Sequence, residues 1–244
     1  MVAVDKAQSE IAFLLDVDNT LLDNDAVQAD LRDHLEREFG AASRDRYWAI
    51  FENLRAELGY ADYLGALQRY RVGVNCDPRL LLMSSFLVDY PFAKRVYPGA
   101  FDAIAYLSEW GPTIIVSDGD VVFQPRKVQR SGLWDAVAGR VLIYIHKERM
   151  LADIASRYPA RRYVMVDDKL RIHTAMKKSW RDRLLTVFVR QGHYAFDADT
   201  LATFPPADVT LEAIGDLVGH DLDGWLHSST LIASFLPQSG AANL

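Results

Sequence analysis

Two acidic residues stand one position apart at the end of the first apolar run of this chain. The run covers residues 11–15 and is followed directly by Asp16, Val17 and Asp18. An apolar run of this length that ends in a polar loop predicts a buried β-strand rather than a helix. Alternate residues of an extended segment point the same way, so Asp16 and Asp18 can face one site. Two carboxylates this close repel each other unless a cation or a shared proton relieves them, which indicates a metal site or acid–base chemistry. The alternative is that one acid only caps a following helix.

Composition excludes several classes of protein. The chain has 244 residues, half of them hydrophobic, which allows one large domain or two small ones with a sizeable core. Cys76 is the only cysteine, so no internal disulfide can form, as expected in a reducing compartment. A net charge of −6 without a long basic run argues against a nucleic-acid partner. We see no secretory segment and no membrane span, and therefore expect a cytoplasmic protein without a membrane partner.

The segment from residue 25 to about residue 90 has apolar residues at helical spacing. Four helices are expected there: one that Asp25 caps and Gly40 closes, one over residues 47–59, one over residues 63–73 and one that Pro78 opens. Helices in series with short connections indicate a small bundle.

Strand-like runs resume after this helical segment. They cover residues 113–116, 141–145, 163–166 and 184–189, and helices are expected to begin between them near Pro98, Gln124, Lys147 and Leu170. Strands that alternate with helices predict a parallel sheet covered on both faces. The helical segment therefore interrupts a sheet domain directly after its first strand.

Chemically reactive residues follow several of these strands. They are Asp16 and Asp18 after the first strand, Ser117 and Asp118 at the second, Lys147 after the third, and Asp167 and Asp168 after the fourth. Because the carboxyl ends of parallel strands share one edge of a sheet, we expect these residues to form one site. Taken singly, the signals are weak, since Asp167 and Asp168 could equally cap the next helix.

The residue types suit phosphoryl transfer. Carboxylate oxygens are preferred Mg²⁺ ligands, so Asp16, Asp167 and Asp168 could hold the ion together with the backbone carbonyl of Asp18. The Ser117 hydroxyl and the amides that follow it, from Asp118 on, can donate to phosphate oxygens, and Lys147 supplies a compact positive charge. A carboxylate nucleophile would split a difficult displacement into two steps through an aspartyl-phosphate.

These motifs together resemble those of the haloacid dehalogenase superfamily. Asp16-Val17-Asp18-Asn19-Thr20 is similar to its first motif, Asp-x-Asp-x-Thr, and Ser117 to the second. Lys147 matches the third motif, and the adjacent acids Asp167-Asp168 match one form of the fourth. Tyr97-Pro98-Gly99 resembles the usual return from an inserted cap. The likeness covers residues 11–22 and 96–219.

The resemblance implies a Rossmann-like α/β core of three layers (α/β/α) from residues 1–22 and 94–244, with a helical cap from residues 23–93. It implies Asp16 as nucleophile and Asp18 as general acid and then base. Mg²⁺ would be held by Asp16, Asp18 and one or both of Asp167 and Asp168. Thr20 would orient the first loop and join Ser117, Asp118 and Lys147 in the phosphate-binding set.

The departures from the family pattern are small. Val17 and Asn19 replace the Phe and Gly of many members, which removes no functional group. Arg171 and Ile172 stand where the spaced form of the fourth motif would need an acid, so the adjacent pair must serve. The dehalogenating members lack an acid at the position of Asp18, and a leaving alkoxide needs a proton whereas a halide does not.

We therefore expect a Mg²⁺-dependent phosphatase of a small phosphorylated metabolite. Two alternatives stay open: a phosphotransferase or phosphomutase with the same site, and a catalytically silent protein that binds a partner through its cap. The sequence does not settle the substrate or the oligomeric state. A few cap arginines could meet a second anionic group, although most should be solvated; they are Arg44, Arg46, Arg55, Arg69 and Arg71. Residues 231–236 are apolar enough to dock against another surface, and residues 238–244 are predicted to be disordered.

Overall fold

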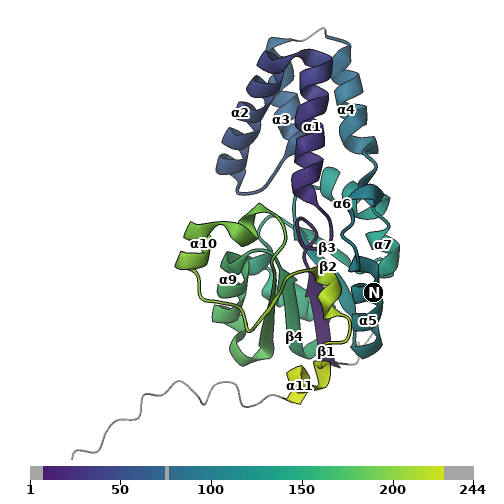
Figure 1. Cartoon of the computed structure of the whole chain (residues 1–244), viewed down its shortest axis with the longest axis vertical. Coiled ribbons are helices and arrows are strands. Elements are labelled where there is room, and N and C mark those ends of the chain that lie inside the picture. The colour runs from purple at the N-terminus through teal and green to yellow at the C-terminus, as the bar shows by residue number, and fades with distance from the viewer. Residues whose placement is uncertain (1–7, 75–76, 228–244) are drawn as a thin grey trace, which may run out of the picture.

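The structure is a computed structural model that describes residues 8–74 and 77–227. It is elongated, with a group of helices at one end and a sheet with its covering helices at the other (Figure 1). The predicted tail segments, residues 231–236 and 238–244, lie outside the described residues, as does Cys76.

The sheet of the described chain has six parallel strands in the order β3-β2-β1-β4-β5-β6. The strands are β1 (Ser9–Leu15), β2 (Thr113–Asp118), β3 (Val141–Tyr144), β4 (Ala160–Asp167), β5 (Leu184–Val189) and β6 (Val209–Leu211). The predicted α/β class with a Rossmann-like parallel sheet is confirmed. The strand β6 was not predicted, because three residues are too short to show a period.

The side chains of β1 alternate between two cores, which gives the three layers. Phe13 and Leu15 belong to the cluster that includes α5 residues such as Ile104, whereas Ala12 and Leu14 belong to the cluster formed with α8 and α9. A strand that is buried on both faces has a continuous apolar sequence, as residues 11–15 of β1 do. The α-helices from residue 100 onward are α5 (Ala100–Trp110), α6 (Phe123–Arg130), α7 (Leu133–Ala136), α8 (Leu151–Arg157), α9 (Leu170–Trp180), α10 (Ala198–Thr203) and α11 (Leu222–His227).

The chain between β1 and β2 begins with four α-helices. They are α1 (Asn24–Phe39), α2 (Ala41–Leu58), α3 (Tyr63–Tyr70) and α4 (Arg79–Asp89). The expectation that Asp25 caps the first helix is wrong: Asp23 is the N-cap, and its carboxylate accepts from the Ala26 amide at 2.8 Å. Both acids suit an N-cap, and only the path of the chain decides between them.

The helical group and the sheet share one core at their junction. Phe123, at the start of α6, packs against Tyr63 of α3 with ring centroids 4.8 Å apart, and against Phe92 with centroids 5.6 Å apart. Gly59 ends α2 at a φ of 81° and lies so close to His146 that a Cβ there would be 2.7 Å from the ring. Glycine at position 59 therefore serves both the left-handed turn and the contact with the sheet domain.

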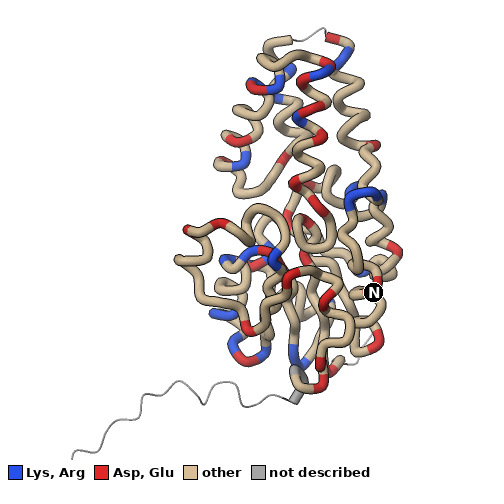
Figure 2. The backbone as a smooth tube through the Cα atoms, viewed as in Figure 1, with Lys and Arg blue, Asp and Glu red and all other residues tan. Residues whose placement is uncertain are grey.

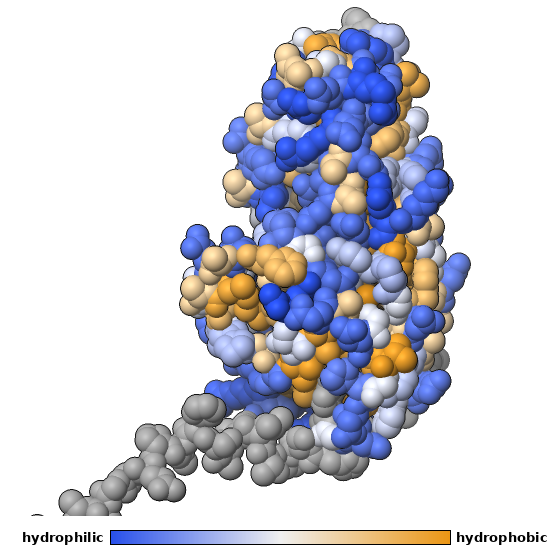
Figure 3. Space-filling view, in the orientation of Figure 1, coloured by the Kyte–Doolittle hydropathy of each residue, from blue (hydrophilic) through white to orange (hydrophobic). Residues whose placement is uncertain are grey.

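Charged residues of both signs lie along the helices of the upper region (Figure 2). The same face of that region is largely hydrophilic, whereas hydrophobic residues gather lower down, around α10 (Figure 3). Among the described residues, no helix combines the length and the apolar character that a membrane span requires.

Candidate active site

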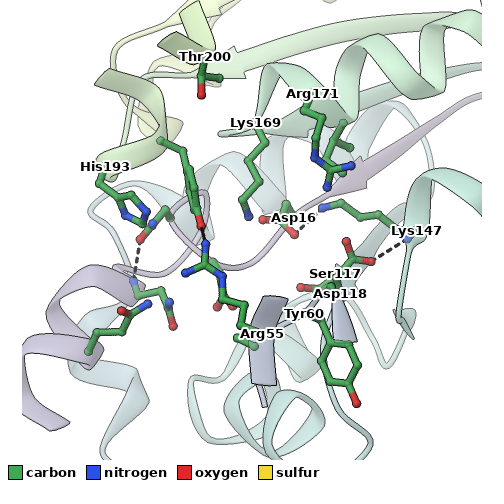
Figure 4. Close-up of a pocket in the computed structure, with 18 of the residues that line it drawn as sticks. Asp16, Arg55, Tyr60, Ser117, Asp118, Lys147, Lys169, Arg171, His193 and Thr200 are labelled. Carbon is green, nitrogen blue, oxygen red and sulfur yellow. Dashed lines mark hydrogen bonds and ion pairs between the residues drawn. The ribbon is translucent and has the colours of Figure 1, made fainter. Parts of the chain in front are cut away.

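The loop after β1 is a tight turn that carries two of the predicted acids. Asn19 adopts a φ of 61°, a left-handed conformation that glycine and asparagine tolerate best. The Asn19 side chain accepts from the backbone amides of Asn24 and Asp25 at 3.0 and 3.2 Å. The loop is thereby tied to the start of α1, and it presents Asp16 and Asp18 to a cavity (Figure 4).

Lys147 lies between two of the predicted acids. Its Nζ is 2.6 Å from Asp16 Oδ1 and 2.6 Å from Asp167 Oδ2, and the three side chains are at most 3% exposed. The predicted convergence of strand ends is therefore present in the structure. A buried ammonium with two carboxylate partners is held in its charged form: the pKa of Lys147 is raised, because Asp16 and Asp167 outweigh the opposing effect of burial.

The three carboxylates of Asp16, Asp167 and Asp168 form a buried cluster with ligand atoms within 4.8 Å of one another. Both oxygens of Asp168 and Oδ2 of Asp16 lack a hydrogen-bond partner among the described residues. Buried carboxylate oxygens without a donor are costly, and a hard cation satisfies them. The cluster therefore fits Mg²⁺ in both donor type and unfilled bonding capacity.

The pKa shifts of the three acids also reflect the cost of burying their charges. Burial raises the pKa of Asp16 and raises that of Asp168 well above its ordinary value. Burial acts in the same direction on Asp167, but Lys147 and Lys169 outweigh it, so the pKa of Asp167 is lowered. Without a cation, Asp168 is therefore the acid of this cluster that ionises least readily.

Ser117 also lines the cavity, at the end of β2. Its hydroxyl accepts a hydrogen bond from Gln124 Nε2 at 2.9 Å. The expectation that the amides after Ser117 are available to phosphate is wrong for Gly119, whose amide donates to the Tyr144 carbonyl at 2.9 Å. This amide is used by the pairing of β2 with β3.

Asp118 and Thr20 differ from the other predicted residues. The Asp118 carboxylate lines the cavity but accepts from the Lys147 amide at 2.7 Å, so it fixes the loop that carries the lysine. Thr20 is fully buried and does not line the cavity. Their assignment to phosphate binding stays a prediction. Neither Asp167 nor Asp168 is the N-cap of α9, which is Lys169, although Asp167 Oδ1 accepts from the Lys169 amide at 2.8 Å.

Two lysines near the acids were missed as site residues. Lys127 on α6 has no exposed surface, and its Nζ lies 2.6 Å from Asp18 Oδ1. Lys169 points toward the acids (Figure 4), with its Nζ 3.6 Å from Asp168 Oδ1. Lys169 follows the acid pair in sequence and could have been suspected. The sequence gives only a weak reason to suspect Lys127 as a site residue, namely its place one helical turn after Gln124. A lysine on a helix is usually solvated.

The cavity has a volume of about 320 Å³ and lies between the sheet edge and the helical group. Of the five cap arginines considered above, only Arg55 lines it, and the Arg55 guanidinium contacts the Tyr194 hydroxyl. Tyr60 also lines the cavity, whereas Tyr47 and Tyr63 are buried in the core. His193 donates its backbone amide to Asp25 at 2.8 Å. Chain segments far apart in sequence thus enclose the space above the acids.

Sequence comparison decides the family. The profile of the haloacid dehalogenase-like hydrolases matches residues 12–179. The chain belongs to this family. A comparison with curated proteins finds no significant match.

Solved structures of haloacid dehalogenase-like hydrolases agree with this assignment. A protein from Burkholderia xenovorans LB400, assigned to the same hydrolases, is 69% identical, with a TM-score of 0.84 over 87% of this chain and 99% of that one. The HAD hydrolase YfnB from Bacillus subtilis is 16% identical, with a TM-score of 0.57 over 86% of this chain and 97% of its own. The L-2-haloacid dehalogenase PA0810 is 17% identical, with a TM-score of 0.59 over 86% and 98%. The last two show likeness of fold alone.

Proposed function

We propose that this hydrolase is a Mg²⁺-dependent phosphatase that acts on a small phosphorylated metabolite through an aspartyl-phosphate. The observation that carries the proposal is the buried cluster of Asp16, Asp167 and Asp168, two of which contact Lys147, with a fourth carboxylate, Asp18, at the same cavity. A cavity of about 320 Å³ is at the lower end of the range for small-molecule sites.

In the first step, an Asp16 oxygen forms a bond to phosphorus while the bond from phosphorus to the ester oxygen breaks. Asp18, protonated, gives its proton to the leaving alkoxide. In the second step, the ionised Asp18 takes a proton from water, whose oxygen attacks phosphorus and releases the Asp16 carboxylate. Lys147 and the Ser117 hydroxyl contact the phosphoryl oxygens and keep the group in line with Asp16.

Mg²⁺ would be held by Asp16, by the Asp18 carbonyl and by one or both of Asp167 and Asp168. When bound, it would neutralise charge on the phosphoryl group. Its further contribution is to relieve the repulsion within the acid cluster. YfnB from Bacillus subtilis was crystallised with magnesium, and its structure is reported to reveal interdomain movement. We propose that the helices α1–α4 of this chain form a cap that closes over the cavity.

The presence of Asp18 favours phosphate chemistry over removal of a halide. A halide leaves as a stable anion, whereas an alkoxide must be protonated, and Asp18 supplies a group for that proton. An expected cytoplasmic location belongs to the proposal, supported by a composition with one cysteine in 244 residues.

A panel of phosphorylated metabolites and p-nitrophenyl phosphate tests the proposal, with release of inorganic phosphate measured with and without Mg²⁺. The proposal predicts phosphate release that depends on Mg²⁺. The same preparation is offered 2-chloropropionate, and no chloride release is expected. Chloride release without phosphate release would contradict the proposal. Transfer of the phosphoryl group to a sugar hydroxyl without free phosphate would replace the phosphatase with a phosphotransferase or phosphomutase.

A further inference from the structure

Lys127 is a charged residue that the fold buries completely, in contact with Asp18 and Asn24 of the cavity lining. It lies on α6, where the preceding residue Arg126 is exposed at its side chain to 41%, whereas Lys127 has no exposed surface. Burial of an ammonium group opposes folding unless good partners offset the lost hydration. A site that accepts this cost for a lysine uses its charge or its hydrogen bonds.

The partners of Lys127 come from two other segments. Its Nζ donates to Asp18 Oδ1 at 2.6 Å and to Asn24 Oδ1 at 3.0 Å. Asp18 belongs to the loop after β1, and Asn24 is the first residue of α1. Lys127 itself is held on a helix whose first amides, those of Val122 and Phe123, are capped by Asp120 at 2.8 and 2.7 Å.

This arrangement constrains one oxygen of the Asp18 carboxylate, Oδ1, and leaves Oδ2 available. Asp18 is 21% exposed at its side chain and lines the cavity, so its carboxylate would be free to rotate without a partner. With Oδ1 bound to a buried lysine, Oδ2 is the atom left to carry a proton to the leaving group. Proton transfer in a transition state depends strongly on this kind of alignment.

We propose that Lys127 is a positioning residue that fixes the Asp18 carboxylate for proton transfer to the leaving oxygen. The inference rests on the proposed phosphatase function. It separates Lys127 from Lys147: Lys147 contacts the nucleophile Asp16 and the transferred group, whereas Lys127 acts through the acid that serves the leaving group.

The test compares two phosphate esters that differ in their need for an acid. The alkoxide that leaves glycerol 2-phosphate must be protonated, whereas p-nitrophenolate leaves without a proton. The ratio kcat/KM reports the steps up to the first irreversible one, so hydrolysis of the aspartyl-phosphate does not enter it. We expect Lys127→Met to lower kcat/KM about 30- to 100-fold for glycerol 2-phosphate and less than about fivefold for p-nitrophenyl phosphate, since general acid catalysis contributes 10²–10⁴-fold.

Three controls bear on this comparison. Lys177→Met is the matched variant, because Lys177 pairs with Asp208 and lies outside the cavity lining; it should leave both rates unchanged. Lys127→Gln keeps a donor without the charge and should show the same selectivity at a smaller magnitude, which serves if the methionine variant does not fold. In an Asp18→Asn background, Lys127→Met should add less than about twofold, because both changes then remove one function.

The outcomes separate the two claims. An equal loss on both esters, or an undiminished loss in the Asp18→Asn background, would overturn the role of Lys127 and leave the phosphatase intact. A wild-type protein that hydrolyses neither ester nor any member of the metabolite panel would overturn both.

Discussion

The surface of the helical group and the centre of the cavity contain ion pairs of nearly the same length. The two kinds of pair differ in how strongly water screens them. On the helices, Arg69 lies 2.8 Å from Glu57, and both side chains are about half exposed, at 48% and 57%. In the cavity, Lys147 lies 2.6 Å from Asp16, and the two side chains are 2% and 3% exposed. Water screens the first pair and dominates its energy, whereas the second pair has given up its hydration.

The comparison shows that burial, and not distance, distinguishes the charges of the cavity from those of the surface. The buried side includes three acids within reach of one another, and both oxygens of Asp168 and Oδ2 of Asp16 have no hydrogen bond among the described residues. Such an arrangement opposes folding unless a cation is present. The surface pairs carry no comparable cost and imply no function. Four predictions test this contrast.

The largest expected effect is on activity, at Asp16, the proposed nucleophile. Asp16→Asn should lower turnover of any phosphate substrate by at least about 10³-fold, because an amide cannot form the aspartyl-phosphate. Steady-state phosphate release measures it, and Asp102→Asn, an exposed acid on the first turn of α5, is the matched control that should keep full activity. Substantial turnover by Asp16→Asn would remove the nucleophile from the account.

The second effect is on stability, at the acid without hydrogen bonds. Because burial raises the pKa of Asp168 well above its ordinary value, its ionisation opposes folding when no metal is present. Asp168→Asn should raise the free energy of unfolding in EDTA at pH 8 by about 1–2 kcal/mol. Saturating Mg²⁺ should stabilise the wild type more than this variant, because the variant binds the ion more weakly. Urea denaturation measures both, and a destabilised variant in EDTA would show that the acid contributes to the fold.

The third effect is of similar size and depends on pH. Burial raises the pKa of Asp118 to about 6. The folded state then binds more protons than the unfolded state between about pH 4 and pH 6, so this residue lowers stability as pH rises through that interval. Asp118→Asn removes the titration but keeps the oxygen that accepts from the Lys147 amide. The variant should gain about 1–2 kcal/mol over the wild type at pH 8 relative to pH 4, in metal-free urea denaturation. A difference that does not vary with pH would refute the shift.

The smallest effect is expected on the surface of the helical group. Arg69→Ala breaks the pair with Glu57 between two solvated side chains. Its effect on the midpoint of thermal unfolding should be too small to resolve at low salt and at high salt. A clear loss of stability would show that exposed pairs in this protein count as much as buried ones, and would weaken the contrast drawn above.

Much of the site follows from the sequence because parallel strands end at one edge. The positions of Asp16, Ser117, Lys147 and Asp167 follow from four apolar runs and the rule that their carboxyl ends converge. The fold class follows from the same alternation of strands and helices. Local patterns sufficed here because each residue comes directly after a strand that is easy to recognise.

The parts that could not be predicted depend on how separate segments approach one another. Lys127 is one lysine among several on helices, and only the path of α6 beside the first loop buries it against Asp18. Tyr194 and Arg55 meet from positions 139 residues apart. No period or spacing in the sequence encodes such contacts, because they are decided by tertiary packing.

The central claim is that the buried acids exist to hold Mg²⁺ beside the nucleophile. Isothermal titration calorimetry of the wild type, Asp168→Asn and Asp102→Asn with Mg²⁺ tests it most directly. The account predicts one binding event in the wild type and in Asp102→Asn, and an affinity at least about tenfold weaker in Asp168→Asn. A wild type that binds no Mg²⁺, or an Asp168→Asn variant that binds it as tightly, would contradict the account.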